Sequence, residues 1–169
     1  MSGQRYTLKI EPLSALAFSP FGDIIEARDT AKNFTINDGF AQRYHNLAKV
    51  DVATAGGYPL VSIFKAKPRL LPLALHMLER HPLGSQAFMP LANQSFLVVV
   101  AQAEKLPEVN QIRCFKTAAG QGVNYFRGTW HHPLIALNQG DFLVIDRGGA
   151  LGDANCDEFL LPNGVVWVG

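Results

Sequence analysis

The sequence predicts a mainly β protein, a sandwich or barrel of many short strands, and three observations support this. First, 15 glycines and 10 prolines are spread along the whole chain of 169 residues, which favours short strands over long helices. Second, several apolar segments have the length and β-branched composition of strands. Third, helix signals are few and short. Strands of this kind need closed or covered sheet edges, which a barrel or a packed pair of sheets provides.

The strongest strand candidates are residues 60–65, 95–101, 122–126 and 141–146. The run from Phe96 to Val100 is continuously apolar and rich in β-branched residues, as expected for a strand that is buried on both faces. We also expect strands over residues 130–137 and 164–168.

Helical and turn signals are confined to a few short stretches. Ser14 can cap a short turn that runs through Phe18 and stops at Pro20. Prolines at the start and middle of residues 69–75 argue against a regular helix there. Residues 37–39 (Asn-Asp-Gly) are a turn candidate, because these residue types tolerate positive φ. The segment 47–59 is predicted to be an exposed connection.

Length and composition predict a single cytoplasmic domain over residues 1–169 and argue against several classes of function. Fifteen basic and fourteen acidic residues leave a net charge of +1, so neither nucleic acid nor an anionic membrane is expected as a partner. No apolar run reaches the roughly 18 residues needed to cross a bilayer, and we expect no signal peptide. Cys114 and Cys156 form no C-x-x-C pair and no evident disulfide framework, which fits a reduced compartment.

Two short windows contain most of the polar residues that could do chemistry. In the first, an extended strand would place Glu79 and His81 on one face. A glutamate and a histidine two residues apart can bind one metal ion, or act as a base and its orienting group. Pro82 and Gly84 can turn the chain and bring Gln86 back beside them. A Glu-x-His pair on its own is more often part of a polar rim on an exposed strand.

The second window spans residues 120–133. Gly128 permits a tight turn, and a strand then begins at Thr129. On that strand His131 and His132 must face opposite sides, so one of them can point into a barrel while the other faces outward or an interface. Both histidines could instead be ordinary hydrogen-bonded residues beside a Trp130 that packs in the core.

The spacing of the two windows together resembles the paired motifs of the cupin superfamily. The motif positions here are Glu79, His81, Gln86 and Asn93 in the first window, and Gly120, Gly128 and His131 in the second. Glu79 stands where cupins have their first histidine, and Gln86 stands where they have a glutamate, which changes the set of metal ligands. The resemblance implies a cupin-type double-stranded β-helix, also called a jelly-roll barrel, with a few short helices.

Longer stretches resemble one family of that superfamily, the ureidoglycolate lyases, and together they cover nearly the whole chain. The runs Glu-Arg-His-Pro-Leu-Gly and Trp-His-His-Pro are specific to this family. The matching stretches are residues 36–39 with 43–45, 78–88, 121–125 with 130–134, and 141–143 with 145–149. The resemblance implies release of urea from ureidoglycolate to leave glyoxylate, a step of allantoin (purine) degradation. It also implies a homodimer, in which Phe34, Phe40 and Tyr44 could form an interface if they do not pack in the core.

This reaction needs a base for the hydroxyl proton and an acid for the departing nitrogen. The side chains of His81 and His131 titrate near neutral pH, so either could serve. Glu79 could orient a histidine, be the base itself or bind a metal. The amide of Gln86 can donate to a developing oxyanion or a carboxylate.

The substrate carboxylate favours arginine, whose planar fork matches it in a bidentate fashion. Arg127 is the first choice, because it directly precedes the turn into the strand of His131. Arg147 is the second choice. Tyr125 shares strand parity with Arg127 and is a further candidate for substrate binding.

The same window residues could hold a metal ion. His81, His131 and Glu79 would suit a first-row divalent ion, and the family resemblance implies Ni²⁺. Because Gln86 replaces an anionic ligand, we expect either weak binding or a site that works without a tightly held metal. No organic cofactor is expected.

Two other functions are compatible with a cupin of this length. A non-catalytic cupin could bind a small carboxylate such as glyoxylate as a sensor, and a cupin isomerase or dioxygenase would act on a different substrate. An oxygenase needs the full His/His/Glu/His ligand set, which this chain lacks. A sensor is normally attached to a DNA-binding domain, which the length and the neutral charge argue against. The resemblance of the runs in both windows to the lyase family favours the lyase over these alternatives.

Overall fold

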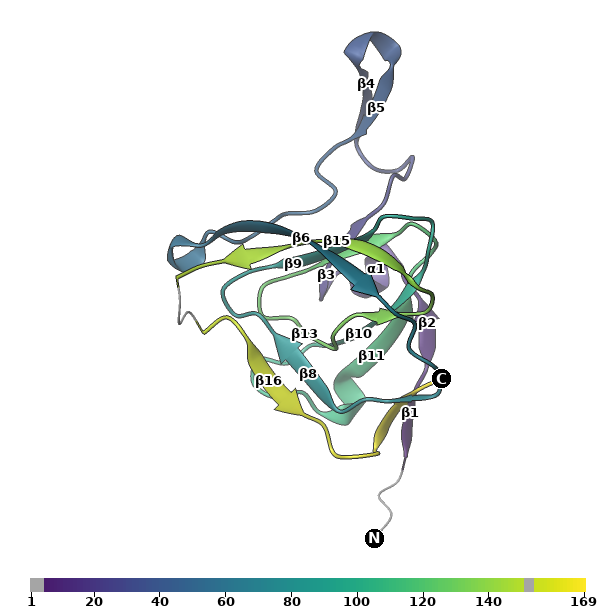
Figure 1. Ribbon diagram of the computed structural model, residues 1–169, viewed down its shortest axis with the longest axis vertical. Helices are drawn as coiled ribbons and strands as arrows, with labels where there is room; N and C mark the ends of the chain where they lie inside the picture. Colours follow the sequence, from purple (N-terminus) through teal and green to yellow (C-terminus); the bar gives the residue numbers. More distant parts are fainter. Residues whose placement is uncertain (1–4, 151–153) are drawn as a thin grey trace.

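The computed structural model describes residues 5–150 and 154–169, and its main body consists of two β-sheets that pack face to face (Figure 1). The larger sheet contains, in order, β16 (Asp157–Leu160), β8 (Met77–Arg80), β13 (Trp130–His131), β10 (Phe96–Ala101), β11 (Ile112–Lys116) and β2 (Ile10–Pro12), with β14 (Ile135–Ala136) also paired to β10. The facing sheet contains β3 (Gly22–Ile25), β12 (Gly122–Tyr125), β9 (Gln86–Pro90), β15 (Gly140–Gly148) and β6 (Tyr58–Ala66).

Two small sheets and four short helices complete the described chain. The small sheets are β1 (Tyr6–Leu8) with β17 (Val166–Val168) and β7 (Leu73–Ala74), and the hairpin of β4 (Asn33–Ile36) and β5 (Ala41–Tyr44). The helices are α1 (Ala15–Phe18) and the 3₁₀ turns η1 (Asn37–Gly39), η2 (Thr54–Gly56) and η3 (Val109–Gln111). None of the described helices has the length and apolar character that a membrane span requires.

The predicted fold class, a mainly β cupin-type barrel with a few short helices, is confirmed. Strand β10 lies at its centre and is buried along its whole length, as the apolar run predicted. Side chains alternate along a strand, so Phe96, Val98 and Val100 pack between the two sheets. Leu97 and Val99 pack into a second core on the other face of the larger sheet.

The other predicted strands are present, with one interruption. Residues 60–65 lie within β6, 122–126 largely within β12 and 141–146 within β15, while β17 falls within 164–168. The single strand predicted over 130–137 is wrong, because β13 ends at His131 and β14 begins only at Ile135. The gap contains Pro133, which has no N–H to donate to a ladder.

The predicted helix and turns are also largely confirmed. Ser14 caps α1, and its hydroxyl accepts a hydrogen bond from the Ala17 N–H at 3.3 Å. Residues 37–39 form η1 with positive φ throughout, and 69–75 contain only the short strand β7. The segment 47–59 is an exposed connection only in part, because Val52 is buried at 7% exposure and the last two residues belong to β6.

The hairpin of β4 and β5 projects from the barrel as an arm (Figure 1). Its main contacts are between its own two strands and the turn η1 that joins them. Phe40, next to that turn, is 92% exposed. The arm therefore presents apolar surface away from the body of its own chain.

Candidate active site

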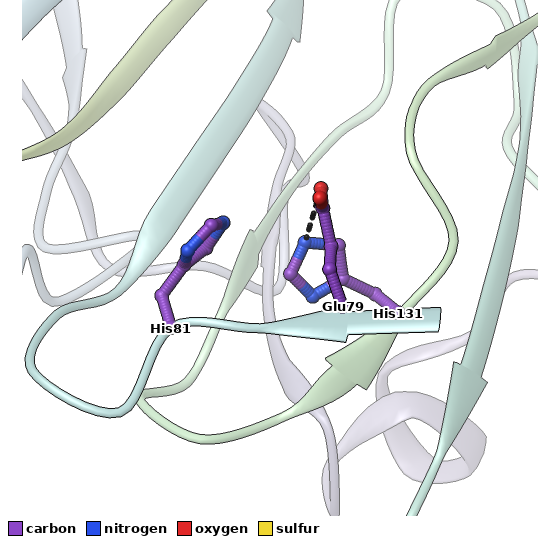
Figure 2. A group of neighbouring side chains, drawn as sticks. All are labelled: Glu79, His81 and His131. Carbon is purple, nitrogen blue, oxygen red and sulfur yellow. Dashed lines mark ion pairs between the residues drawn. The ribbon is translucent and has the colours of Figure 1, made fainter. Parts of the chain in front are cut away.

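Strands β8 and β13 bring the three predicted metal-binding residues together (Figure 2). Their antiparallel pairing sets His131 opposite Glu79, so both side chains lie on the same face of the sheet. His81 follows directly after β8 and joins them, with its ring centroid 5.2 Å from that of His131. Atoms of Glu79, His81 and His131 that could act as ligands all lie within 4.8 Å of one another.

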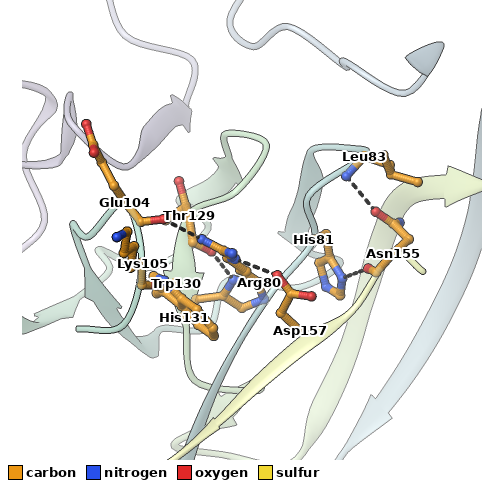
Figure 3. A network of polar contacts seen from close by, with 10 residues as sticks. All are labelled: Arg80, His81, Leu83, Glu104, Lys105, Thr129, Trp130, His131, Asn155 and Asp157. Atoms are coloured by element: carbon orange, nitrogen blue, oxygen red, sulfur yellow. Dashed lines mark hydrogen bonds and ion pairs between the residues drawn. The ribbon is translucent and has the colours of Figure 1, made fainter. Parts of the chain in front are cut away.

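Backbone carbonyls hold both imidazoles in one tautomer (Figure 3). His81 Nδ1 lies 2.8 Å from the carbonyl oxygen of Asn155, and His131 Nδ1 lies 2.9 Å from that of Thr129. A carbonyl can only accept a hydrogen bond, so each Nδ1 carries the proton and each Nε2 of a neutral ring presents a lone pair. Both Nε2 atoms are buried and have no hydrogen-bond partner among the described residues. With the carboxylate of Glu79, three acceptors converge on a position that suits a cation.

The carboxylate of Glu79 is ionised at neutral pH. Its interaction with the His131 imidazole holds the pKa of Glu79 below the ordinary value of 4.5, and this outweighs partial burial, which alone would raise the pKa. His131 Nε2 and Glu79 Oε1 are 3.5 Å apart, which is long for a hydrogen bond. The contact is an ion pair only when His131 is protonated. With both imidazole rings neutral, the cluster supplies one negative charge and two lone pairs.

Strands β9 and β12 bring Gln86 and Tyr125 to the same interior, because these residues are register partners. The Tyr125 ring stacks on that of His131, with centroids 4.3 Å apart and planes 16° apart, which holds the imidazole plane. Burial raises the pKa of the Tyr125 phenol, so the hydroxyl stays neutral. Gln86 Nε2 donates to Asp146 Oδ2 at 3.3 Å, while Gln86 Oε1 is buried without a partner among the described residues.

A cavity of about 280 Å³ opens beside His81. It is lined by His81, Ser85, Asp146, Arg147, Asn155 and Cys156. This is the low end of the size of ligand pockets and suits a small molecule. Arg147 is 7% exposed, and its Nε and Nη2 donate to the Thr54 carbonyl at 3.0 and 2.8 Å. Its guanidinium therefore places a fixed positive charge at the cavity wall.

Arg127, the first choice from sequence for the substrate carboxylate, lies elsewhere. It is exposed, and its Nη1 donates to Thr54 Oγ1 at 2.6 Å. It lines a neighbouring cavity of about 270 Å³ that shares only Ser85 with the cavity beside His81. The geometry therefore favours Arg147, the second choice, because it lines the same cavity as His81.

The adjacent residues His131 and His132 lie in different surroundings. His131 lies with Glu79, His81 and Tyr125, whereas His132 Nδ1 lies 2.7 Å from the carbonyl oxygen of Pro133. Burial lowers the pKa of His132, which keeps its ring neutral. The predicted alternation of strand faces thus assigns His131 to the cluster.

The sequence matches the family model described as ureidoglycolate lyase over residues 5–168. The chain belongs to the ureidoglycolate lyase family. A protein of Burkholderia mallei (strain NCTC 10229) named ureidoglycolate lyase is 54% identical over 163 residues, which cover 96% of this chain and 93% of that protein. A protein of the same name from Pseudomonas entomophila (strain L48) is 48% identical over 92% of this chain and 92% of its own length. Another, from Pseudomonas aeruginosa (strain LESB58), is 51% identical over 90% of this chain and 89% of its own length.

For this member of the ureidoglycolate lyase family, sequence reasoning missed four residues of the cavity wall: Ser85, Asp146, Asn155 and Cys156. Ser85 and Asp146 had a signal, because both lie within stretches that resemble the family. Asn155 had none, because it is 74 positions from the histidine that it contacts.

Proposed function

We propose that this protein cleaves ureidoglycolate to glyoxylate and urea, as a carbon–nitrogen lyase of allantoin (purine) degradation. Membership of the family and the names of relatives about half identical to it support the substrate and the reaction. The structural observation that carries the proposal is the cluster of Glu79, His81 and His131 beside a small cavity with a buried arginine in its wall.

Ureidoglycolate carries a hydroxyl, a carboxylate and a ureido nitrogen on one carbon. A base takes the hydroxyl proton, the oxygen forms a carbonyl with the carbon, and the carbon–nitrogen bond breaks with its electron pair going to nitrogen. An acid then protonates the nitrogen, and urea leaves. The proton taken from the hydroxyl balances the one given to nitrogen, so neither water nor a covalent nucleophile is consumed.

The wall of the cavity offers a group for each of these needs. The carboxylate of Asp146 can accept the hydroxyl proton and return it to nitrogen. The Nε2 lone pair of His81 can do the same only while it does not bind a metal ion. The guanidinium of Arg147 attracts the substrate carboxylate. The amide of Gln86 lies beside Asp146 and can hold it in place or donate to the substrate. Tyr125 acts on His131 by stacking, so its effect on the substrate is through that ring.

We propose further that Glu79, His81 and His131 hold a weakly bound divalent metal ion, with Ni²⁺ as the choice that the family suggests. The donors fit such an ion, because two imidazole lone pairs and one carboxylate are a set that first-row metals accept. Both imidazoles also have the Nδ1–carbonyl bond typical of metal-binding histidines. When bound, the ion would polarise a substrate oxygen. No organic cofactor is proposed.

The test of the function is a product assay on purified protein given ureidoglycolate, scoring urea, ammonia and glyoxylate together. We expect urea and glyoxylate in equal amounts and no ammonia. Ammonia in place of urea would identify an amidohydrolase. Saturable glyoxylate binding by folded protein without any turnover would support the sensor.

The same assay tests the metal when it is run on protein treated with a chelator. We expect most of the activity to be lost and then restored by added Ni²⁺. Full activity in a sample shown to be metal-free would contradict the metal proposal and leave the lyase proposal standing.

We also propose a homodimer, supported by two exposed apolar surfaces. One is the arm with Phe40, and the other is the outer face of β6, where Val61 and Ile63 are 68% and 51% exposed. A lone two-stranded hairpin is marginally stable in water, so a second copy that covers it would stabilise it. Phe34 and Tyr44 lie on the same arm. Sedimentation equilibrium should give twice the chain mass of 18.5 kDa, and a monomer at micromolar concentration would refute the dimer.

We place the protein in the cytoplasm. Cys114 and Cys156 are both free, which suits a reducing compartment. Recovery of the protein in the soluble cytoplasmic fraction of its own cells would support this placement, and recovery in a secreted or membrane fraction would contradict it.

A further inference from the structure

The two histidines of the cluster are oriented in different ways. The partner of His131 Nδ1 is the carbonyl of Thr129, two positions away on the same chain segment. The partner of His81 Nδ1 is the carbonyl of Asn155, 74 positions away. The tautomer of His81 therefore depends on how a remote segment docks, whereas that of His131 depends on a carbonyl two residues before it in the chain.

The side chain of Asn155 fixes that docking. Its Oδ1 accepts a hydrogen bond from the backbone N–H of Leu83 at 2.9 Å, while its carbonyl oxygen lies 2.8 Å from His81 Nδ1 (Figure 3). Asn155 thus forms hydrogen bonds with the residue before Pro82 and with the residue after it. Any residue at position 155 would offer a backbone carbonyl to His81. The hydrogen bond from the Leu83 N–H, however, needs a short side chain at position 155 that ends in an acceptor.

The chain beyond Asn155 is anchored as well. Asp157 is the register partner of Arg80, and its Oδ2 accepts from Arg80 Nε at 2.8 Å. Arg80 also lies over the ring of Trp130, with its guanidinium carbon 4.6 Å from the ring centroid, and donates to the carbonyl of Glu104 at 2.9 Å. These contacts hold β16 against β8, and Asn155 lies two residues before the start of that strand.

We propose that Asn155 is a positioning residue that holds His81 with its Nε2 lone pair directed at the cluster. The proposal rests on the proposed function only in taking His81 as part of the lyase site. Without the Oδ1–Leu83 bond the carbonyl of Asn155 moves away from His81, and the ring gains the opposite tautomer. That tautomer places an N–H where Glu79 and His131 need a lone pair to complete a cation site.

The test compares three variants with the unaltered protein. Asn155→Ala removes the acceptor for Leu83, and Asn155→Asp keeps an acceptor of the same size. Leu160→Ala is the matched control, because Leu160 lies on β16, the strand that follows Asn155, and is 75% exposed. Circular dichroism checks that each variant folds, and Asn155→Leu, which has a similar shape and no acceptor, replaces Asn155→Ala if the alanine variant does not fold.

Three measurements follow on each variant. Imidazole ¹⁵N NMR of metal-free protein reports the tautomer of His81, Ni²⁺ titration by calorimetry reports the affinity of the cluster, and initial rates on ureidoglycolate separate kcat from KM. We expect Asn155→Ala to mix the two tautomers and to weaken Ni²⁺ binding by about 10- to 100-fold. It should lower kcat much more than it changes KM. Asn155→Asp should restore the Nδ1–H tautomer and Ni²⁺ affinity within a few-fold, and Leu160→Ala should change nothing.

A merely structural role for Asn155 would leave the tautomer and the Ni²⁺ affinity of folded Asn155→Ala unchanged, and that result would overturn the proposal. Equal losses in the alanine and aspartate variants would overturn it too. If the unaltered protein fails to cleave ureidoglycolate, the proposed function falls. The NMR and Ni²⁺ measurements would still decide the role of Asn155.

Discussion

Replacing His131 with alanine should lower kcat/KM for ureidoglycolate by about 100- to 10,000-fold, the range expected for loss of a group that acts in acid–base or metal chemistry. His131 is the centre of the cluster, because it pairs with Glu79, faces His81 and stacks on Tyr125. Its side chain is almost fully buried, so water is poorly placed to take over its role. Initial rates of urea and glyoxylate formation measure the effect.

The matched control is His76→Ala, which removes an exposed histidine just before β8 and should leave kcat/KM within twofold. Far-ultraviolet circular dichroism should show that both variants fold, because a collapsed His131 variant would lose activity for an uninformative reason. Normal turnover by a folded His131→Ala variant would show that the reaction takes place outside this cluster.

Replacing Trp130 with alanine should lower the free energy of unfolding by about 3–5 kcal/mol. Trp130 is 1% exposed in the second core, where its ring meets Phe159 edge to face at 6.2 Å. Its Nε1–H donates to the carbonyl of Lys105 at 2.9 Å, and Arg80 lies over its face. Trp130→Ala leaves a large cavity in the core and leaves the Lys105 carbonyl without its hydrogen-bond donor. Urea unfolding followed by circular dichroism measures the loss.

Trp167→Ala tests whether burial is the cause, because it removes the other tryptophan from a partly exposed position. Trp167 Nε1 donates to the carbonyl of Gly164 near the surface, so we expect a loss of only about 1 kcal/mol. Similar losses of unfolding free energy for the two variants would show that burial of Trp130 in the second core is not the cause.

A Trp130→Ala variant that stays folded should also lose activity, since His131 is the next residue on the strand.

Local pattern was sufficient to predict most of the fold. Strand β10 was predictable because a run of five apolar residues of strand length suits burial on both faces, and β10 packs into two cores. Helix α1 was predictable because its cap is local, from Ser14 to Ala17. The break at Pro133 was missed, although the loss of a backbone donor at proline is itself a local rule.

Much of the candidate site was predictable for the same reason. Glu79 and His81 share a strand face by simple alternation, and His131 and His132 are separated by it, so the predicted trio contained the residues that meet. The resemblance to the family then supplied the reaction, which spacing alone left open among several cupin activities.

What the tertiary structure decided are the contacts between segments far apart in the chain. The register of β8 with β13 sets Glu79 against His131, and nothing in either strand alone specifies that pairing. The closure of the barrel brings Arg147 to the cavity and leaves Arg127 in the neighbouring one, although Arg127 is closer to His131 in sequence. The contact between Asn155 and His81 likewise joins segments far apart in the chain. Residue type and spacing determined which chemistry the chain can do, and the strand pairing and long-range hydrogen bonds of the fold decided which of the candidate residues meet.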